Sequence, residues 1–370
     1  MTRKASSGWL VQLDGLRGIS ILMVLTAHVF APAWKRLRGD YGVTVFFVLS
    51  GFLITRLLLR EEHDTGGISL PAFYVRRAFR LLPIYYLILA VYCVLILGIG
   101  LYPEARQKFA YALPWYLLYL QEIPFFSKPE APPPFYQSWS LGIEEKFYMV
   151  WPLVAFRVLR SRNARIALAT GAAVSFSAAR LVFQGRYIFP YAAISVGCLS
   201  ALLYDAPGIR NRLDAWVSSW RAFLVFLTWP ILHVAIAWLS LPFAIRLAAD
   251  LAYPLSIAFV ILATLRSSQL ASLFSFAPLA LLGRYSYCMY LIHVLVRRAV
   301  ERILHLRTGE GNGLLVLLLM LLFSTAGAVV LHYTIESRFR EVGRRIAASW
   351  KGKEKAPDTR RPTLVVEDGL

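Results

Sequence analysis

The sequence predicts an all-α membrane protein that crosses the bilayer about ten times. Of its 370 residues, 58% are apolar and 14% are aromatic, and apolar runs near 20 residues long recur along the chain. A soluble domain has a lower apolar fraction and interleaves it with charge, whereas a helix needs about 20 apolar residues to span the hydrocarbon layer. Length and composition therefore predict a polytopic helical bundle.

The ten apolar segments lie at about residues 13–33, 43–59, 81–101, 139–158, 165–182, 188–204, 222–239, 247–265, 285–304 and 313–335. An even number places both termini on one side, and the loops on that side hold most of the Lys and Arg, which predicts cytoplasmic termini. We expect residues 1–12 to form a cytoplasmic N-terminus that leads into an uncleaved signal anchor, and residues 13–340 to form the membrane domain.

Two stretches do not fit a span. Residues 109–123 are apolar and aromatic but short, and we expect an interfacial or re-entrant segment there. Residues 341–370 are basic and nearly free of aromatics, which favours a flexible cytoplasmic tail.

The net charge of +19 is spread over short loops and the C-terminus. This distribution fits the positive-inside bias and attraction to anionic membrane lipids, and it argues against a nucleic-acid partner. The three cysteines, Cys93, Cys198 and Cys288, fall in apolar segments without metal-ligand spacing, so we expect no metal site.

The first apolar segment carries three ionisable residues, Asp14, Arg17 and His28. Eleven helical steps of about 100° return almost to the starting direction, so Arg17 and His28 share a face about 16 Å apart, and Asp14 lies near it. Ionisable groups inside a membrane are costly and usually mark chemistry or transport. A histidine that only packs between helices is the alternative.

Arginines gather at the cytoplasmic mouth of the third segment. Arg77 and Arg80 are three residues apart on a helix and can present two guanidinium groups to one polyanion, with Arg76 beside them. A nucleotide-like ligand with several phosphates is the natural partner. The competing explanation is that these arginines only orient the segment.

The fourth segment opens with two adjacent carboxylates, Glu144 and Glu145. Ser138 or Ser140 can cap the helix, and one glutamate is favoured near a helix N-terminus. Capping alone does not require both carboxylates and Lys146, so we expect a functional role, although the sequence does not distinguish between the two glutamates.

Two further patterns complete the set. His293 is a second histidine within a predicted span, and the Ser50-Gly51 pair allows another helix to approach closely. Motifs for P-loop nucleotide binding, zinc proteolysis and serine hydrolysis are absent from the sequence. Together the clusters suggest transfer between a cytoplasmic anion and an outer acceptor.

In this order the motifs resemble acyltransferase family 3, a family of integral membrane proteins, from Leu13 to about Arg340. The resemblance rests on runs that the family shares with this chain: Asp14-Gly15-Leu16-Arg17 with His28, Gly42 to Ile54, Arg77-Ala78-Phe79-Arg80, and Trp139-Ser140-Leu141 to Pro152.

The resemblance implies transfer of an acyl group, often acetyl, from cytoplasmic acyl-CoA to a hydroxyl of a carbohydrate or lipid-linked glycan in the bacterial plasma membrane. Acyl-CoA would be a co-substrate, and no cofactor would be bound permanently. His28 would be the catalytic base, and the other site residues that we expect fall into three groups: Arg17, Asp14, Glu144 and Glu145 at the catalytic centre, Arg76, Arg77 and Arg80 on the CoA phosphates, and Trp139, Ser140, Tyr148 and His293 on the substrate.

Three positions depart from the family pattern: Thr44 stands where Asp is frequent, Lys146 where Gln is frequent, and no Pro follows Glu336 at the usual place. We expect these three differences to affect how the acceptor is bound more than whether the protein is active. Two other functions remain open. A transporter or flippase for an anionic or acylated solute could use the same His and Arg without any dependence on acyl-CoA, and a non-catalytic scaffold would be insensitive to loss of Arg77 and Arg80.

Overall fold

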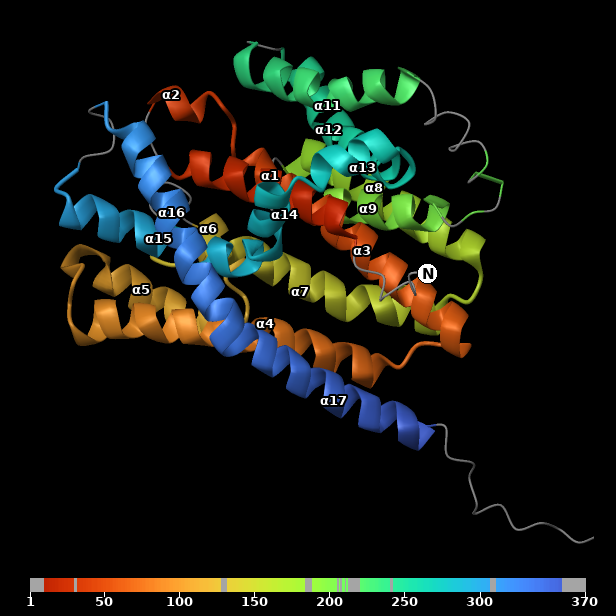
Figure 1. Ribbon diagram of the computed structural model, residues 1–370, viewed down its shortest axis with the longest axis horizontal. Helices are drawn as coiled ribbons and strands as arrows, with labels where there is room; N and C mark the ends of the chain where they lie inside the picture. The colour runs from red at the N-terminus through yellow and green to blue at the C-terminus, as the bar shows by residue number, and fades with distance from the viewer. Residues whose placement is uncertain are drawn as a thin grey trace, which may run out of the picture.

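The protein, seen in a computed structural model, is mostly helical in the part that the structure describes, and that part contains no strand (Figure 1). The described residues are 10–29, 32–127, 132–183, 188–204, 206, 208–209, 211, 220–239, 242–306 and 311–354. The helices are α1 (Val11–Ala27), α2 (Pro32–Lys35), α3 (Tyr41–Thr65), α4 (Leu70–Cys93) with the π-helical turn η1 (Val94–Gly98), α5 (Pro103–Leu117), α6 (Glu122–Ser127), the short 3-10 helix η2 (Tyr136–Ser138), α7 (Trp139–Pro152) with the π-helical turn η3 (Leu153–Val158), α8 (Arg162–Phe183), α9 (Phe189–Tyr204), α11 (Trp220–Trp238), α12 (Phe243–Arg266), α13 (Ser268–Phe274), α14 (Ala277–Arg284), α15 (Ser286–Ile303), α16 (Gly313–Leu331), the π-helical turn η4 (His332–Glu336) and α17 (Ser337–Glu354).

Each of the ten predicted segments falls on a helix, which confirms the all-α prediction. Among the described residues, three helices are long and apolar enough to cross a membrane: Tyr41–Thr65, Leu70–Gly98 and Gly313–Trp350. Up to five crossings result if the bent pairs α12–α13 and α14–α15 each count as one span. The number of ten spans and the cytoplasmic position of both termini stay predictions.

Three local expectations need correction. Residues 109–123 do not form one continuous element, because α5 ends at Leu117 and α6 begins at Glu122, and their interfacial or re-entrant position stays a prediction. Residues 341–354, expected in a flexible tail, continue α17, and residues 355–370 lie outside the described part. The helix α17 is held against α4, where Gly343 lies so close to Phe79 that a Cβ there would crowd its ring.

The third correction concerns His28, which we expected in mid-helix. It is the C-cap of α1, whose last helical residue is Ala27. Pro32 begins α2 and cannot donate the backbone hydrogen bond that a continuing helix would require from it. His28 is therefore placed at a helix end, where its backbone is turned away from the regular ladder.

The centre of the bundle is built by close backbone contacts of α3. Gly51 lies against the Ile194 carbonyl of α9, and Gly197 of α9 lies against the Val48 carbonyl of α3, so a Cβ at either glycine would overlap backbone. Small residues that let backbones approach are the usual basis of helix packing in membranes. The predicted role of Gly51 in close approach is confirmed.

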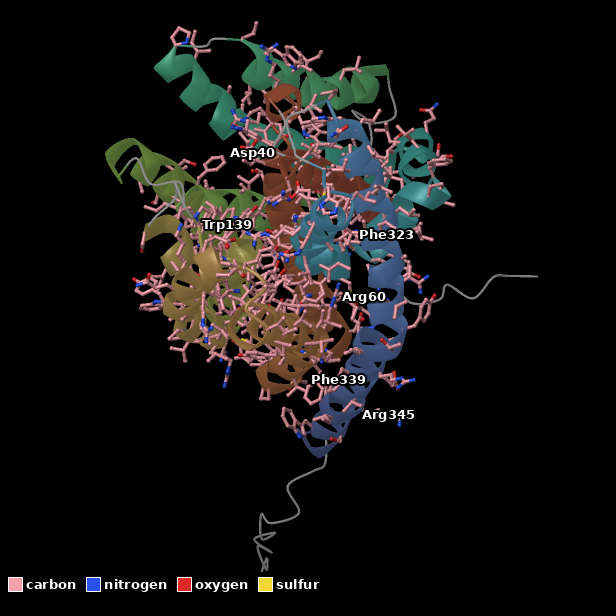
Figure 2. All side chains as sticks on the ribbon, turned by 90° about the vertical axis from the view of Figure 1, so that its left-hand side faces the viewer. Asp40, Arg60, Trp139, Phe323, Phe339 and Arg345 are labelled. Atoms are coloured by element: carbon pink, nitrogen blue, oxygen red, sulfur yellow. The ribbon has the colours of Figure 1, made fainter. Side chains whose placement is uncertain are left out.

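The outer face of the bundle carries the longest helical run, α16–η4–α17 (Figure 2). In the view of Figure 2 it runs from Phe323 to Arg345 along one side of the molecule. Its π-helical turn places His332 and Glu336 in the interior, where His332 Nδ1 lies 2.9 Å from a Glu336 carboxylate oxygen.

Candidate functional site

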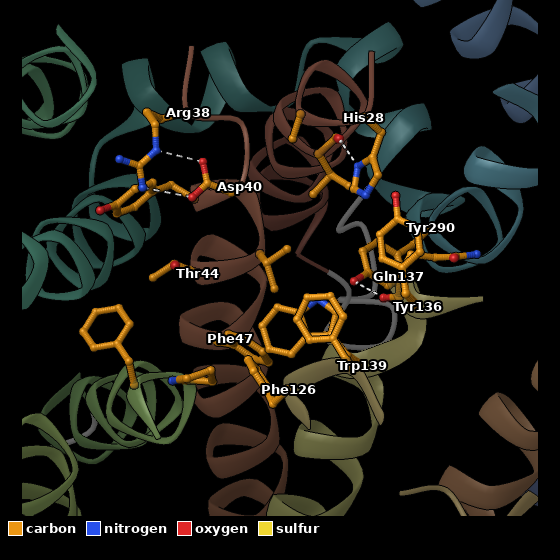
Figure 3. A pocket seen from close by; sticks show the side chains of 17 residues that line it. His28, Arg38, Asp40, Thr44, Phe47, Phe126, Tyr136, Gln137, Trp139 and Tyr290 are labelled. Atoms are coloured by element: carbon orange, nitrogen blue, oxygen red, sulfur yellow. Dashed lines mark hydrogen bonds and ion pairs between the residues drawn. The ribbon is translucent and has the colours of Figure 1, made fainter. Parts of the chain in front are cut away.

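Two neighbouring cavities contain most of the predicted site residues. The larger, of about 580 Å³, is lined by His28 and Trp139 and is named the His28 cavity (Figure 3). The smaller, of about 90 Å³, is named the arginine cavity, and Arg17, Arg77 and Arg80 line it. The motifs therefore gather into two connected groups rather than into a single pocket.

His28 presents a defined nitrogen to the site. Its Nδ1 lies 2.8 Å from the Val24 carbonyl oxygen, which can only accept a hydrogen bond, so Nδ1 carries the proton. In a neutral ring Nε2 is then the nitrogen with the lone pair. The end of α1 thus fixes the tautomer that a general base needs.

A second histidine lies beside His28. The His293 ring meets the His28 ring edge-on with centroids 4.6 Å apart. His293 is fully buried on α15, and its Nδ1 donates to the Tyr290 carbonyl oxygen at 2.6 Å. Its Nε2 is buried without a hydrogen-bond partner among the described residues. His293 supports the His28 ring but is not part of the cavity lining, so its predicted contact with substrate stays a prediction.

Stacked rings form one wall of the His28 cavity. Phe125 of α6 stacks on Trp139 of α7 with centroids 5.3 Å apart and planes 5° apart, and it also stacks on Tyr136 at 6.2 Å. Tyr136 continues the row to His28 at 5.9 Å. A row of flat apolar faces that ends at a basic nitrogen suits a ring-shaped ligand with hydroxyl groups.

Polar groups face this wall. Arg38 holds Asp40 through two hydrogen bonds of 3.0 Å, and Figure 3 shows this pair across the cavity from His28. On the aromatic side, the Tyr136 hydroxyl is buried and has no hydrogen-bond partner in the described chain. Burial raises the pKa of Tyr136 above its ordinary value, so its hydroxyl stays protonated and can donate to a ligand.

The arginine cavity combines four cations, Arg17, Arg77, Arg80 and Arg284, with one carboxylate, Glu144. Arg17 of α1 pairs with Asp14 at 3.3 Å, and the Arg77 guanidinium of α4 lies 5.1 Å from the Tyr148 ring centre. Glu144 of α7 lines the same cavity and accepts a 2.7 Å hydrogen bond from Ser50 of α3. Side chains of α1, α3, α4 and α7 therefore meet in one charged site.

The two cavities share three lining residues, Val43, Phe47 and Tyr290. Tyr290 is held firmly, because its hydroxyl donates to the Gln137 carbonyl oxygen at 2.6 Å and lies 2.7 Å from Ser140 Oγ. Since the tyrosine proton is used toward Gln137, the serine hydroxyl donates to Tyr290. This junction separates the arginines from His28.

The structure distinguishes between the two adjacent glutamates. Glu144 lines the arginine cavity, whereas Glu145 does not. Of the predicted substrate contacts, Ser140 and Tyr148 line the arginine cavity and Trp139 lines the His28 cavity.

Arg76 differs from its neighbours. It bonds Glu61 of α3 at 2.8 Å and lies outside both cavities. The helical step from Arg76 to Arg77 turns the side chain by about 100°, which explains why only Arg77 and Arg80 reach the cavity. The prediction that Arg76 belongs with them is not supported by this placement.

Two of the positions that depart from the family pattern, Thr44 and Lys146, lie in or near the walls of the cavities. Thr44 lines the His28 cavity. Lys146 pairs with Glu122 at 2.5 Å and also donates to the carbonyl oxygens of Tyr119 and Gly142, which fastens α6 to α7. Lys146 is thus a connection behind the aromatic wall rather than a group inside a cavity.

Sequence reasoning missed several lining residues. Tyr290 stands three residues before His293 in a motif that we had singled out, so helical spacing could have found it. Phe125, Tyr136, Arg38 and Asp40 come from loops and short helices, where no periodic pattern marks them.

Comparison with known proteins gives one family. The model of the acyltransferase domain family matches residues 10–333. The peptidoglycan O-acetyltransferase OatA of Listeria monocytogenes is 28% identical over 323 residues, which cover 79% of this chain and 50% of the relative. The putative peptidoglycan O-acetyltransferase YrhL of Bacillus subtilis is 31% identical over 306 residues, or 76% of this chain and 47% of the relative.

A putative O-acetyltransferase of Staphylococcus aureus is 36% identical over 158 residues, which cover 40% of this chain and 25% of that protein. The chain thus spans about half the length of the first two relatives. No solved structure matches it.

Proposed function

This chain belongs to the family of acyltransferase domains that matches residues 10–333, and on that premise we propose that it is a membrane O-acetyltransferase. The donor is cytoplasmic acyl-CoA, with acetyl the expected group, and the acceptor is a hydroxyl of a cell-envelope glycan at a bacterial plasma membrane. The single observation that carries the proposal is that the cavity of His28 and the cavity of the arginines meet at Val43, Phe47 and Tyr290.

The donor side is the arginine cavity. Guanidinium groups bind phosphates through paired hydrogen bonds, and Arg17, Arg77 and Arg80 concentrate three of them. A volume of about 90 Å³ is well below the roughly 300–1,000 Å³ of small-ligand sites, so this cavity suits a slender chain and not a whole nucleotide. The phosphates of CoA therefore stay at the arginines while the thioester arm extends toward the junction.

The acceptor side is the His28 cavity. Its volume of about 580 Å³ lies within the range of small-ligand sites, about 300–1,000 Å³. The stacked faces of Trp139, Phe125 and Tyr136 suit a sugar ring, while Asp40 and the Tyr136 hydroxyl can bind its hydroxyl groups. The relatives named peptidoglycan O-acetyltransferases favour a glycan of the cell wall as the acceptor.

The reaction requires a base for the acceptor hydroxyl. His28 Nε2 takes the hydroxyl proton as the acceptor oxygen attacks the thioester carbonyl carbon. The carbon–sulfur bond then breaks, the ester forms, and the proton passes from His28 to the CoA thiolate. In the neutral ring, the hydrogen bond from Nδ1 to the Val24 carbonyl oxygen leaves the lone pair on Nε2.

The test uses the purified chain in nanodiscs with labelled acetyl-CoA and reads the release of free CoA thiol, with and without glycan fragments. We expect His28→Ala to lower acceptor-stimulated release by at least about 100-fold, the lower end of general-base contributions. Arg77→Ala/Arg80→Ala should mainly raise the KM for acetyl-CoA. His63→Ala is the matched control, because this imidazole is 89% exposed at the far end of α3.

Either of two results would contradict the proposal: folded wild-type protein that neither binds nor turns over any acyl-CoA, or a His28→Ala variant with unchanged rate. The first of these would favour the transporter instead.

A further inference from the structure

A third cavity, of about 530 Å³, lies outside both cavities described above and is named the basic pocket. Its walls come from α5, from α15 and from the residues Pro132 and Pro134 before η2. The charged side chains that line it are Glu104, Lys108, Arg297, Arg298, Glu301 and Arg302. We propose that this pocket binds a phosphate ester.

The charge balance of the basic pocket favours an anion, because four cations line it against two carboxylates. One carboxylate is already engaged: both oxygens of Glu301 lie 2.7 Å from Arg297 Nη1. Arg298 and Arg302 form no ion pair with a carboxylate in the described ranges. A phosphate group would supply the negative charge that this arrangement lacks.

Two guanidinium groups are held in place before any ligand arrives. Arg298 and Arg302 lie 5.2 and 5.7 Å from the centre of the Tyr102 ring, and Arg302 also donates to the Leu101 carbonyl oxygen at 3.1 Å. Cation–π contacts of this kind fix a guanidinium without neutralising it. Planar donors that are already oriented lose less entropy when they bind a phosphate.

The helix dipole alone explains only some of the cations in the basic pocket. Cations near a helix C-terminus are favoured by the helix dipole, and Arg302 lies in the last turn of α15. This does not account for Lys108, which α5 brings to the same cavity, nor for the hollow between α5 and α15. Two separate helices therefore converge on one positively charged recess.

The basic pocket and the His28 cavity are lined by residues that stand close together along the chain. Arg297 is one helical turn beyond His293, whose ring touches His28, and it lies on the side away from Arg17. Pro134 lines the basic pocket, while Tyr136 and Gln137 line the His28 cavity. A phosphate ester held here could belong to an anionic lipid headgroup or to a phosphorylated soluble or lipid-linked glycan. The chemistry of recognition is the same in each case.

The test measures binding directly and does not depend on acyl transfer. The full chain is purified in a maltoside detergent, which carries no phosphate, and titrated with inorganic pyrophosphate while the thermal unfolding midpoint is followed. Because Arg77 and Arg80 offer a second anion site, the titration uses the Arg77→Ala/Arg80→Ala background. We expect Arg298→Gln/Arg302→Gln in that background to weaken the apparent affinity by at least about tenfold.

The matched control is Arg106→Gln, an exposed arginine on α5 that does not line the pocket and should bind as the background does. Lys108→Gln, exposed on the same helix, should weaken binding severalfold and decides the matter if the double variant fails to fold. Equal affinity in the pocket variants, or an equal loss in Arg106→Gln, would overturn the proposal.

The source of the phosphate follows from a second arm with added phosphatidylglycerol. If the lipid competes and weakens pyrophosphate binding, the pocket holds a headgroup. If the lipid has no effect, the pocket takes the phosphate of a soluble or glycan-linked ligand. Both outcomes support a phosphate-ester site.

Discussion

At the scale of single residues, the site depends on how the backbone fixes polar groups. The Val24 carbonyl sets the tautomer of His28, and the Gln137 carbonyl sets the direction in which the Tyr290 hydroxyl donates. In both contacts the partner is a neutral backbone carbonyl, so no charge has to be buried in the apolar interior. For the catalytic proposal, the contact with Val24 leaves the lone pair of a neutral His28 on Nε2.

Glu144 and Glu145 provide a test at this scale. Glu144 faces the arginines and Ser50, whereas Glu145 lies outside the cavity, so Glu144→Gln removes the charge that balances Arg17, Arg77 and Arg80. We expect Glu144→Gln to lower kcat/KM for acetyl-CoA by about tenfold and Glu145→Gln to change it by no more than about twofold. Initial rates of CoA release measure both, and the reverse order would show that the wrong glutamate has been assigned.

The sequence predicted most of these residues but not their grouping. Arg17, His28 and Glu144 stood out because ionisable groups are rare in apolar segments, and Arg77 and Arg80 because they lie three residues apart at the mouth of one. Their division between two cavities depends on the side chains of Val43, Phe47 and Tyr290, which look like ordinary core residues in the sequence. Arg76 was grouped with Arg77 by proximity in sequence, yet its partner Glu61 lies on another helix.

At the scale of helices, close packing decides which faces meet. The paired glycines Gly51 and Gly197 bring α3 and α9 into backbone contact, and α3 supplies the junction between the two cavities through Val43 and Phe47. A change that separates these helices would therefore disturb the site from a distance.

Gly51→Val tests this contact. A side chain at 51 would overlap the Ile194 carbonyl, which is backbone and cannot rotate away, so we expect a loss of stability of about 1–3 kcal/mol or more. Gly171→Val is the matched control, because no atom lies within 4 Å of a Cβ built at that glycine of α8. Thermal unfolding midpoints compare the two variants, and similar midpoints would mean that α3 and α9 are less tightly packed.

The residues at which helices begin and end were harder to predict than the presence of the helices. The polar composition of residues 341–354 indicated a flexible tail, but one face of α17 carries Gly343 and Ala347 and packs on α4. A prediction from composition averages both faces of an amphipathic helix, whereas packing uses only one. The break between α5 and α6 was missed for a related reason, since aromatic side chains continue through it.

At the scale of the whole molecule, the arginine cavity, His28 and the basic pocket follow one another along the bundle. α1 leads from Arg17 to His28, and α15 runs beside it from Tyr287, in the arginine cavity, past His293 to the basic pocket at Arg297. A donor that binds at one end and an acceptor that binds at the other can react only across the junction. In the proposed reaction, we therefore expect the route between the cavities to control the rate of transfer and not the binding of either substrate.

Narrowing that route is the sharpest test of the arrangement. Val43→Phe adds bulk at a residue shared by both cavities, while the arginines and His28 stay in place. We expect the KM for acetyl-CoA to stay within about twofold and acceptor-stimulated CoA release to fall by about tenfold or more, since the reacting atoms no longer reach each other. Val174→Phe, 61% exposed on α8, is the matched control and should leave both values unchanged. Unchanged turnover in Val43→Phe would mean that acyl groups do not pass this junction, and that donor and acceptor meet elsewhere in the bundle.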